Sequence, residues 1–207
     1  MMVSMSTQMV HPTKEFLIET VMTLLQSKEA DQITSEEVLA FAGISRGSLY
    51  HHFADFPELI EVAKIRRFGT FVDRTIETLQ TIATTSGTRE EMITKFREIA
   101  TLKETDEMRA LRMHRITVIS RAIHNPRMAD ALGLEQERLT TSIANLYREI
   151  VAKGWGNSEL EPRTVAVMIQ SCTVGKIIDD ITPNHMNNEN WSEAVNLVLE
   201  TVIFPVA

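Results

Sequence analysis

Side chains that could carry chemistry are concentrated in one short stretch, GISRGSLYHHFADF, at residues 43–56. The stretch contains the cation Arg46, two serines, a tyrosine and the adjacent pair His51 and His52, and no acid precedes Asp55. Hydrogen-bond donors without carboxylates suit a phosphate-rich partner, whereas paired histidines also raise the question of metal binding or catalysis. Three kinds of site must therefore be compared: a metal site, a catalytic site and a binding surface.

Metal binding and catalysis find little support in the rest of the sequence. Adjacent side chains on a helix point about 100° apart, so His51 and His52 are poorly oriented to chelate one ion. Asp179 and Asp180 form an acidic pair that lacks a third carboxylate at a useful spacing. The HExxH, phosphate-loop and Glu-x-x-His signatures are absent from the sequence. We therefore expect no metal, no cofactor and no enzymatic activity, and a solvated helix face is the plain alternative for the histidine pair.

Two short helices are expected to position this stretch. Thr34 to Glu37 has the form of a capping box, which would start a helix that ends at Gly43. Ser45 is a natural N-cap for a second helix that ends near Phe53. A helix, a tight turn and a second helix form the core of a helix-turn-helix module.

Helical periodicity divides the second helix into a buried and an exposed face. Leu49 and Phe53 lie four residues apart and would share the buried face. The exposed face then carries Arg46, Gly47, Ser48, Tyr50, His51 and His52. Gly47 costs about 1 kcal/mol inside a helix relative to alanine, which is reasonable if a partner must approach the backbone closely.

Most of the remaining chain also has helical periodicity, and no stretch of alternating β-branched residues predicts a strand. We expect an all-α fold of about nine helices, near residues 12–28, 34–43, 45–53, 55–82, 88–103, 105–123, 127–153, 162–182 and 190–204. The change from short to long helices predicts a flexible tail at residues 1–11, a small unit with the helix-turn-helix at 12–55 and a larger helical unit at 56–207.

The bulk composition limits the class of protein. Of the 207 residues, 43% are hydrophobic and 24% are charged, and no apolar run approaches a membrane span of about 18 residues. The single cysteine, Cys172, fits a reducing setting, and no signal peptide is evident, so we expect a cytoplasmic protein. Because the net charge is −7, DNA binding would have to come from a local surface and not from the charge of the whole protein.

Residues 13–60 resemble the DNA-binding domain of TetR-type (tetracycline-repressor-like) transcriptional regulators. The resemblance rests on a Thr-initiated second helix and on three consecutive motifs, which here read Ala42-Gly43-Ile44-Ser45, Arg46-Gly47-Ser48-Leu49-Tyr50 and His51-His52-Phe53. Order and spacing agree with the family pattern over about a quarter of the chain. The helical layout that follows is also similar to that of the family.

The resemblance implies a role for each exposed residue of the module. Thr34 and Ser35 would meet phosphates, and the partner that approaches the helix backbone at Gly47 would be DNA. The residues expected in or beside the major groove are Arg46, Ser48 and Tyr50, and those expected at backbone phosphates or rim bases are His51 and His52. We expect Arg46 to contact a base edge, because the bidentate arginine–guanine pair is the commonest specific contact.

Two positions depart from the family pattern. Phe56 stands where the family often has a phosphate-binding lysine, and Phe41 takes a position that is usually polar. Lys64, Arg66 and Arg67 are expected to restore some positive potential. With few phosphates neutralised, we expect a modest dependence of DNA binding on salt.

The resemblance further implies a homodimer that binds a (pseudo)palindromic double-stranded DNA operator. The last two helices are the candidates for the dimer interface, because they carry more apolar residues than one buried face needs: Val165, Ile169, Val174, Ile177, Ile178, Ile181, Trp191, Val195, Leu197, Val198, Val202 and Ile203. Recognition helices would then lie one DNA turn, roughly 34 Å, apart.

The middle helices would enclose a site for a small-molecule effector. Candidate lining residues are Met92, Phe96, Met113, Thr117, Ser120, Tyr147, Gln170 and Cys172. Arg112, Arg115 and Arg121 are expected to be solvated charges or members of ion pairs.

The resemblance implies a repressor that is released from its operator by a small molecule. An activator of the same fold, a protein-interaction module whose N-terminal helices expose Phe41 and Phe56, and an all-helical enzyme are the alternatives.

Overall fold

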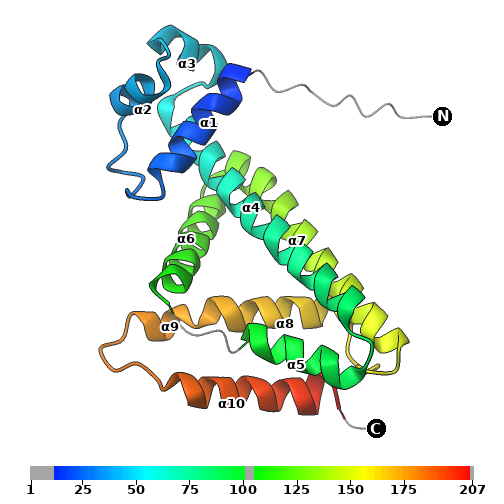
Figure 1. Ribbon diagram of the computed structural model, residues 1–207. Helices are drawn as coiled ribbons and strands as arrows, with labels where there is room; N and C mark the ends of the chain where they lie inside the picture. Colours follow the sequence, from blue (N-terminus) through cyan, green and yellow to red (C-terminus); the bar gives the residue numbers. More distant parts are fainter. Residues whose placement is uncertain (1–11, 101–104, 206–207) are drawn as a thin grey trace, which may run out of the picture. The chain divides into compact units, whose positions relative to one another are not determined.

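The computed structural model describes residues 12–100 and 105–205, and all regular structure in these two ranges is helical (Figure 1). The elements are α1 (Pro12–Leu24), α2 (Ser35–Ala42), α3 (Arg46–His52), α4 (Phe56–Thr85), α5 (Arg89–Ala100), α6 (Asp106–Ile123), α7 (Pro126–Ala152), α8 (Pro162–Gly175), α9 (Ile177–Asp180), α10 (Asn188–Val198) and the π-helical turn η1 (Leu199–Ile203). The predicted all-α class is confirmed. The predicted tail at residues 1–11 lies outside the described residues.

Two differences from the predicted helix boundaries stand out. The first helix ends at Leu24 and continues as turns instead of running to residue 28. The helix predicted over 162–182 is divided into α8 and α9, with Lys176 between them. Gly175, which ends α8, is a weak helix former, so a break at this point costs little.

Contacts divide the chain into two compact units, Met1–Arg67 and Phe68–Ala207. The division falls inside α4, so the first turns of that helix belong to the same unit as α1, α2 and α3. The sequence placed the domain boundary earlier, at residue 55.

The N-terminal unit is built around one apolar core. Leu17 and Val21 of α1, Val38 of α2, Leu49 of α3 and Leu59 of α4 are all fully buried. Each of these helices therefore contributes its apolar stripe to the same interior, as the periodicity predicted. This core holds the short helices α2 and α3, which could not be stable in isolation.

Local signals define the ends of the short helices. The Thr34 hydroxyl accepts a hydrogen bond from the Glu37 N–H at 3.2 Å, and the Ser45 hydroxyl accepts one from Ser48 at the same distance. Between the two helices Gly43 adopts the left-handed conformation, with φ of 63°. Both predicted N-caps and the predicted glycine stop are confirmed.

In the C-terminal unit, α7 packs against α6 and α8, and α5 packs against α10 (Figure 1). One apolar cluster of this unit includes Met92 of α5, Tyr147 of α7 and the buried Phe204 that follows η1. The Tyr147 hydroxyl donates to the Asn157 carbonyl at 2.9 Å, and the Asn157 N–H donates to the Ile203 carbonyl at 3.0 Å. These bonds tie the C-terminal residues to the helices around them.

Two tryptophans lie in the C-terminal unit, each beside a lysine. Trp155 packs against the apolar cluster, and the ammonium of Lys153 lies 4.7 Å from the centre of its ring. Trp191 of α10 has Lys176 at 6.0 Å in the same arrangement.

No helix among the described residues is long and apolar enough to cross a membrane.

Candidate functional site

The face of α3 that does not enter the core carries the predicted contact residues. Leu49 and Phe53 are buried, as predicted. The side chains or backbone left at the surface are those of Arg46, Gly47, Tyr50 and His51, which are exposed, and Ser48 and His52, which are half-buried. The amphipathic division inferred for this helix is therefore confirmed.

The start of α2 adds two hydroxyls that already have hydrogen-bond partners. Thr34 is exposed and its hydroxyl serves as the N-cap acceptor described above. The Ser35 hydroxyl donates to Glu36 Oε2 at 3.1 Å. A phosphate at this helix start would meet the backbone N–H groups of the first turn as well as these side chains.

An acidic partner for Arg46 was missed by the sequence analysis. Nη2 of Arg46 lies 2.6 Å from Oε1 of Glu36, and both side chains are well exposed, at 63% and 70%. The pKa of Glu36 lies below its usual range, chiefly because of a backbone hydrogen bond at Glu36 itself and also because of Ser35 and Arg46. The stretch around α3 is free of acids, but the folded surface is not, because the turn brings a residue ten positions earlier into contact.

The two histidines stack edge to face. Their ring centroids are 5.0 Å apart and the planes meet at 70°. In the described part of the chain, no group of three or more His, Cys, Asp or Glu side chains is placed to hold a metal ion. The pair therefore has no further ligands from the described residues.

The two phenylalanines that depart from the family pattern differ from each other. Phe41 is 61% exposed on α2. Phe56 packs against the core of the N-terminal unit, so the expectation that it is exposed is wrong. Beside it, the Asp55 carboxylate accepts a hydrogen bond from the Glu58 N–H, and the Glu58 carboxylate accepts one from the Ala54 N–H.

The cations of α4 that were expected to restore positive potential are largely engaged. Arg66 forms a two-bonded ion pair with Glu15, at 2.9 and 3.0 Å. Arg67 donates to the Leu25 carbonyl, and Lys64 is buried. Ion pairing of Arg66 and burial of Lys64 reduce the contribution of these two side chains to the surface potential, whereas Arg67 keeps its charge because its acceptor is neutral.

No protein-family model matches the sequence, and no curated protein sequence matches it. Several solved structures do match this chain. A TetR-family transcriptional regulator from Mesorhizobium loti superposes with a TM-score of 0.66 at 16% identity, covering 89% of this chain and 92% of that chain. A second, from a Rhodococcus species, gives a TM-score of 0.63 at 16% identity and covers 92% and 98%.

The chain has the fold of TetR-family transcriptional regulators. A transcriptional regulator from Saccharomonospora viridis in complex with choline has the same fold, with a TM-score of 0.68 and 16% identity over 93% of this chain and 98% of that chain. The likeness extends over both units, so the TetR fold predicted from the N-terminal motif holds for the rest of the chain as well.

The predicted effector-site residues do not gather at one place in the TetR fold. Met92 and Tyr147 are buried in the apolar cluster of the C-terminal unit, and Phe96 packs on its edge, 5.6 Å from the Phe204 ring. Exposed positions are taken by Met113, Thr117, Ser120 and Cys172. None of the eight lines the shallow groove of about 350 Å³ between α4 and α5, which is formed by Glu77, Thr78, Thr81, Ile82, Lys95, Glu98 and Ile99.

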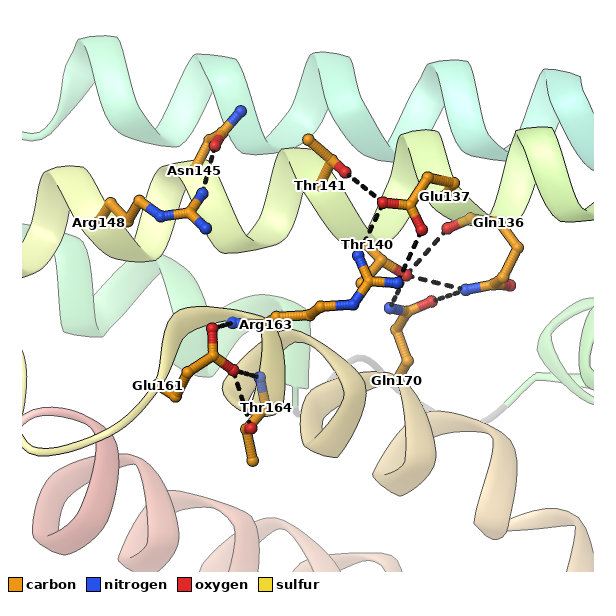
Figure 2. Close-up of polar contacts among 10 residues, drawn as sticks. All are labelled: Gln136, Glu137, Thr140, Thr141, Asn145, Arg148, Glu161, Arg163, Thr164 and Gln170. Carbon is orange, nitrogen blue, oxygen red and sulfur yellow. Dashed lines mark hydrogen bonds and ion pairs between the residues drawn. The ribbon is translucent and has the colours of Figure 1, made fainter.

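Gln170, the one of the eight not yet described, belongs to a polar seam between α7 and α8 (Figure 2). Its carbonyl oxygen accepts from Gln136 at 2.5 Å, and its own amide donates to the buried Thr140 at 3.1 Å. Beside it, Glu137 and Arg163 form two bonds of 2.7 Å, and this pairing, with Thr141, lowers the pKa of Glu137 to about 2. The seam satisfies its own hydrogen bonds and joins the two helices.

The arginines of α6 have three different environments. Arg112 is buried and makes two bonds of 2.8 Å to Asp180 of α9, which confirms the expected ion pair. Arg121 is exposed. Arg115 is only 6% exposed, and no described residue forms a hydrogen bond or ion pair with it. The expectation of a solvated or paired charge is wrong for Arg115, because the helix turns it into the interior.

The last helices leave several apolar side chains at the surface. Ile178 and Ile181 are about three-quarters exposed, and Leu197, Val198 and Val202 are also exposed. Val165 and Ile203, which were assigned to the same surface from the sequence, are buried within this chain.

Proposed function

We propose that the protein is a DNA-binding transcriptional regulator that uses the exposed face of α3 to recognise an operator. The observation that carries the proposal is the amphipathic division of α3 within a TetR fold, which leaves Arg46, Tyr50 and His51 exposed on a helix anchored by Leu49 and Phe53. Such a helix fits the major groove, where an arginine can make two bonds to guanine.

A homodimer is part of this proposal. The exposed apolar side chains of α9, α10, η1 and the turn after α9, such as Ile178, Ile181 and Leu197, would lose contact with water against a second copy. A two-fold dimer presents two recognition helices to half-sites about 34 Å apart, so the operator would be (pseudo)palindromic.

Regulation would come from a small molecule bound in the C-terminal unit. A regulator of the same fold has been solved in complex with choline, which supports small-molecule binding by this architecture. A ligand releases the operator only by its differential affinity for the two conformations. We favour a repressor released by its effector, as the family resemblance suggests, and an activator is the alternative.

The exposed Phe41 favours a second candidate, a protein-interaction module. A gel-shift or anisotropy titration with the DNA upstream of the protein's own coding region separates the two. Retardation at low salt that is lost in Arg46→Ala supports the regulator. Absence of binding to any such fragment at low salt would refute the regulator and favour the protein-interaction module. Transcription in vitro from the bound fragment then distinguishes repression from activation.

A further inference from the structure

Arg115 of α6 is a buried cation that has no counter-charge among the described residues. Its side chain is only 6% exposed, its Nε is buried without a hydrogen-bond acceptor, and no carboxylate of the described residues pairs with it. Its charge contacts the ring of Phe71, whose centre lies 4.7 Å from the guanidinium carbon. A cation–π contact of this kind compensates a buried charge only in part.

Arg112, one turn earlier on the same helix, shows what a satisfied buried arginine looks like in this protein. It donates one hydrogen bond to each carboxylate oxygen of Asp180. Burial lowers the pKa of Arg115 to about 10, so Arg115 keeps its proton near pH 7 and cannot escape the cost by becoming neutral. The missing element at Arg115 is therefore an anion.

The surroundings of Arg115 limit the chemistry of that anion. Phe68 and Val72 of α4 and Val118 of α6 are fully buried, and the rings of Phe68 and Phe71 are 6.0 Å apart. Val118 lies three residues from Arg115 and so shares its helix face. A single positive charge among apolar groups is neutralised by one negative charge. A phosphate dianion would leave excess charge buried and would lack further donors.

We infer that Arg115 is the anchor for the carboxylate of a small monoanionic ligand with an apolar body, held between α4 and α6 of the C-terminal unit. The guanidinium would donate two parallel hydrogen bonds to the carboxylate, and the apolar side chains around it would cover the body of the ligand. This inference rests on the proposed function only in taking that ligand to be the effector.

The test uses the full chain and a panel of sodium carboxylates: hexanoate, octanoate, benzoate and phenylacetate. The matched neutral compounds are 1-hexanol, 1-octanol, benzyl alcohol and 2-phenylethanol, and sodium chloride controls for ionic strength. Thermal unfolding and titration calorimetry are measured without DNA. At least one carboxylate should raise the melting temperature in a saturable manner, while its alcohol binds about tenfold more weakly or worse.

Two variants locate the site. Arg115→Met removes the charge with little change in volume, and it should abolish the carboxylate-dependent shift or weaken it by about tenfold or more. Arg121→Met removes an exposed arginine of the same helix and should leave the shift unchanged. If Arg115→Met does not fold, Arg115→Lys keeps the charge but not the two-bonded geometry and should still weaken the carboxylate selectively.

The inference is overturned if no carboxylate of the panel stabilises the wild-type protein beyond sodium chloride, if alcohols bind as well as carboxylates, or if Arg115→Met retains the shift. Operator binding is measured separately without any ligand. Loss of operator binding with an intact carboxylate site would refute the proposed regulator alone, and the reverse result would refute this site alone.

Discussion

Arg46 on α3 and Arg115 on α6 differ in exposure and in pairing. Arg46 is solvent-exposed and bonded to Glu36, whereas Arg115 is buried and has no acidic partner among the described residues. An exposed ion pair is weak enough to be exchanged for a phosphate or a base at little cost. A buried cation has little contact with water, so a bound anion would compensate its charge. The first arrangement suits reversible reading of a surface and the second suits capture of a ligand.

The largest effect is expected where a buried arginine loses the partner it has. Asp180→Asn removes the acid from Arg112, and we expect the free energy of unfolding to fall by about 2–3 kcal/mol, because a buried charge is left poorly compensated. Urea unfolding measures it. Asp130→Asn, an exposed acid on α7, is the control and should change stability by less than about 0.5 kcal/mol. If Asp180→Asn lowers the free energy of unfolding no more than Asp130→Asn does, the ion pair of Arg112 contributes little to stability. The contrast drawn between the paired Arg112 and the unpaired Arg115 would then fail.

The same pair predicts a pH dependence. The hydrogen bond from Arg112 holds the pKa of Asp180 below its ordinary value. A carboxyl whose pKa is lowered by folding stabilises the protein above its unfolded pKa of about 3.9 and loses that contribution as the pH falls through the folded value. The difference between the wild type and Asp180→Asn should therefore be full at pH 7 and should shrink below about pH 4.

On the exposed side of the comparison, Arg46→Ala should cost about 1–3 kcal/mol of operator affinity and relax the preference at one base position. Fluorescence anisotropy with an operator and its single-base variants measures both quantities. Stability should be almost unchanged, because Arg46 is exposed. An equal loss across all sequences would make Arg46 a phosphate contact.

Gly43 and Gly47 of the helix-turn-helix are expected to be glycine for different reasons, one for backbone conformation and the other for contact with DNA. Gly43→Ala should destabilise the protein by about 1 kcal/mol, since Gly43 has a φ of 63°. Gly47→Ala should raise stability by up to about 1 kcal/mol, because the added Cβ meets no atom closer than 4.0 Å. If DNA approaches the α3 backbone, Gly47→Ala nevertheless weakens operator binding. Unchanged operator affinity in this stabilised variant would argue against close approach.

The smallest effect is expected from Glu36→Gln, which releases Arg46 without touching it. Non-specific DNA should bind more tightly and with a salt slope steeper by about one, whereas operator affinity should change less. Glu193→Gln, an exposed acid on α10, serves as the control for net charge. Equal gains from the two variants would assign the effect to overall charge and remove the special role of the Glu36 pair.

Local signals made the N-terminal unit predictable from sequence. Thr34, Gly43 and Ser45 each act within a few residues of their own position, so helix ends and the exposed face of α3 follow from neighbours in the chain. The acid that pairs with Arg46 was not predictable from α3 alone, because it comes from α2 across the turn. The capping position of Thr34 places Glu36 on the first turn of α2 and was the available signal.

The C-terminal unit was predictable as helices but not as a site. Apolar residues occur on more than one face of α6, where Met113 is 47% exposed and Val118 is fully buried. Periodicity therefore could not decide which side of the helix enters the interior. The partner of each α6 arginine depends on distant residues, Asp180 for one and Phe71 for the other. These tertiary contacts have no local signature in the sequence.

Both tryptophans of the chain, Trp155 and Trp191, belong to the C-terminal unit. Intrinsic tryptophan fluorescence thus reports the melting of that half alone, while far-ultraviolet circular dichroism reports helices of both halves. If the two signals coincide on a urea gradient, the halves unfold cooperatively. If they separate, the circular dichroism change that fluorescence does not follow belongs to the helix-turn-helix module, and its stability can be measured in the intact chain.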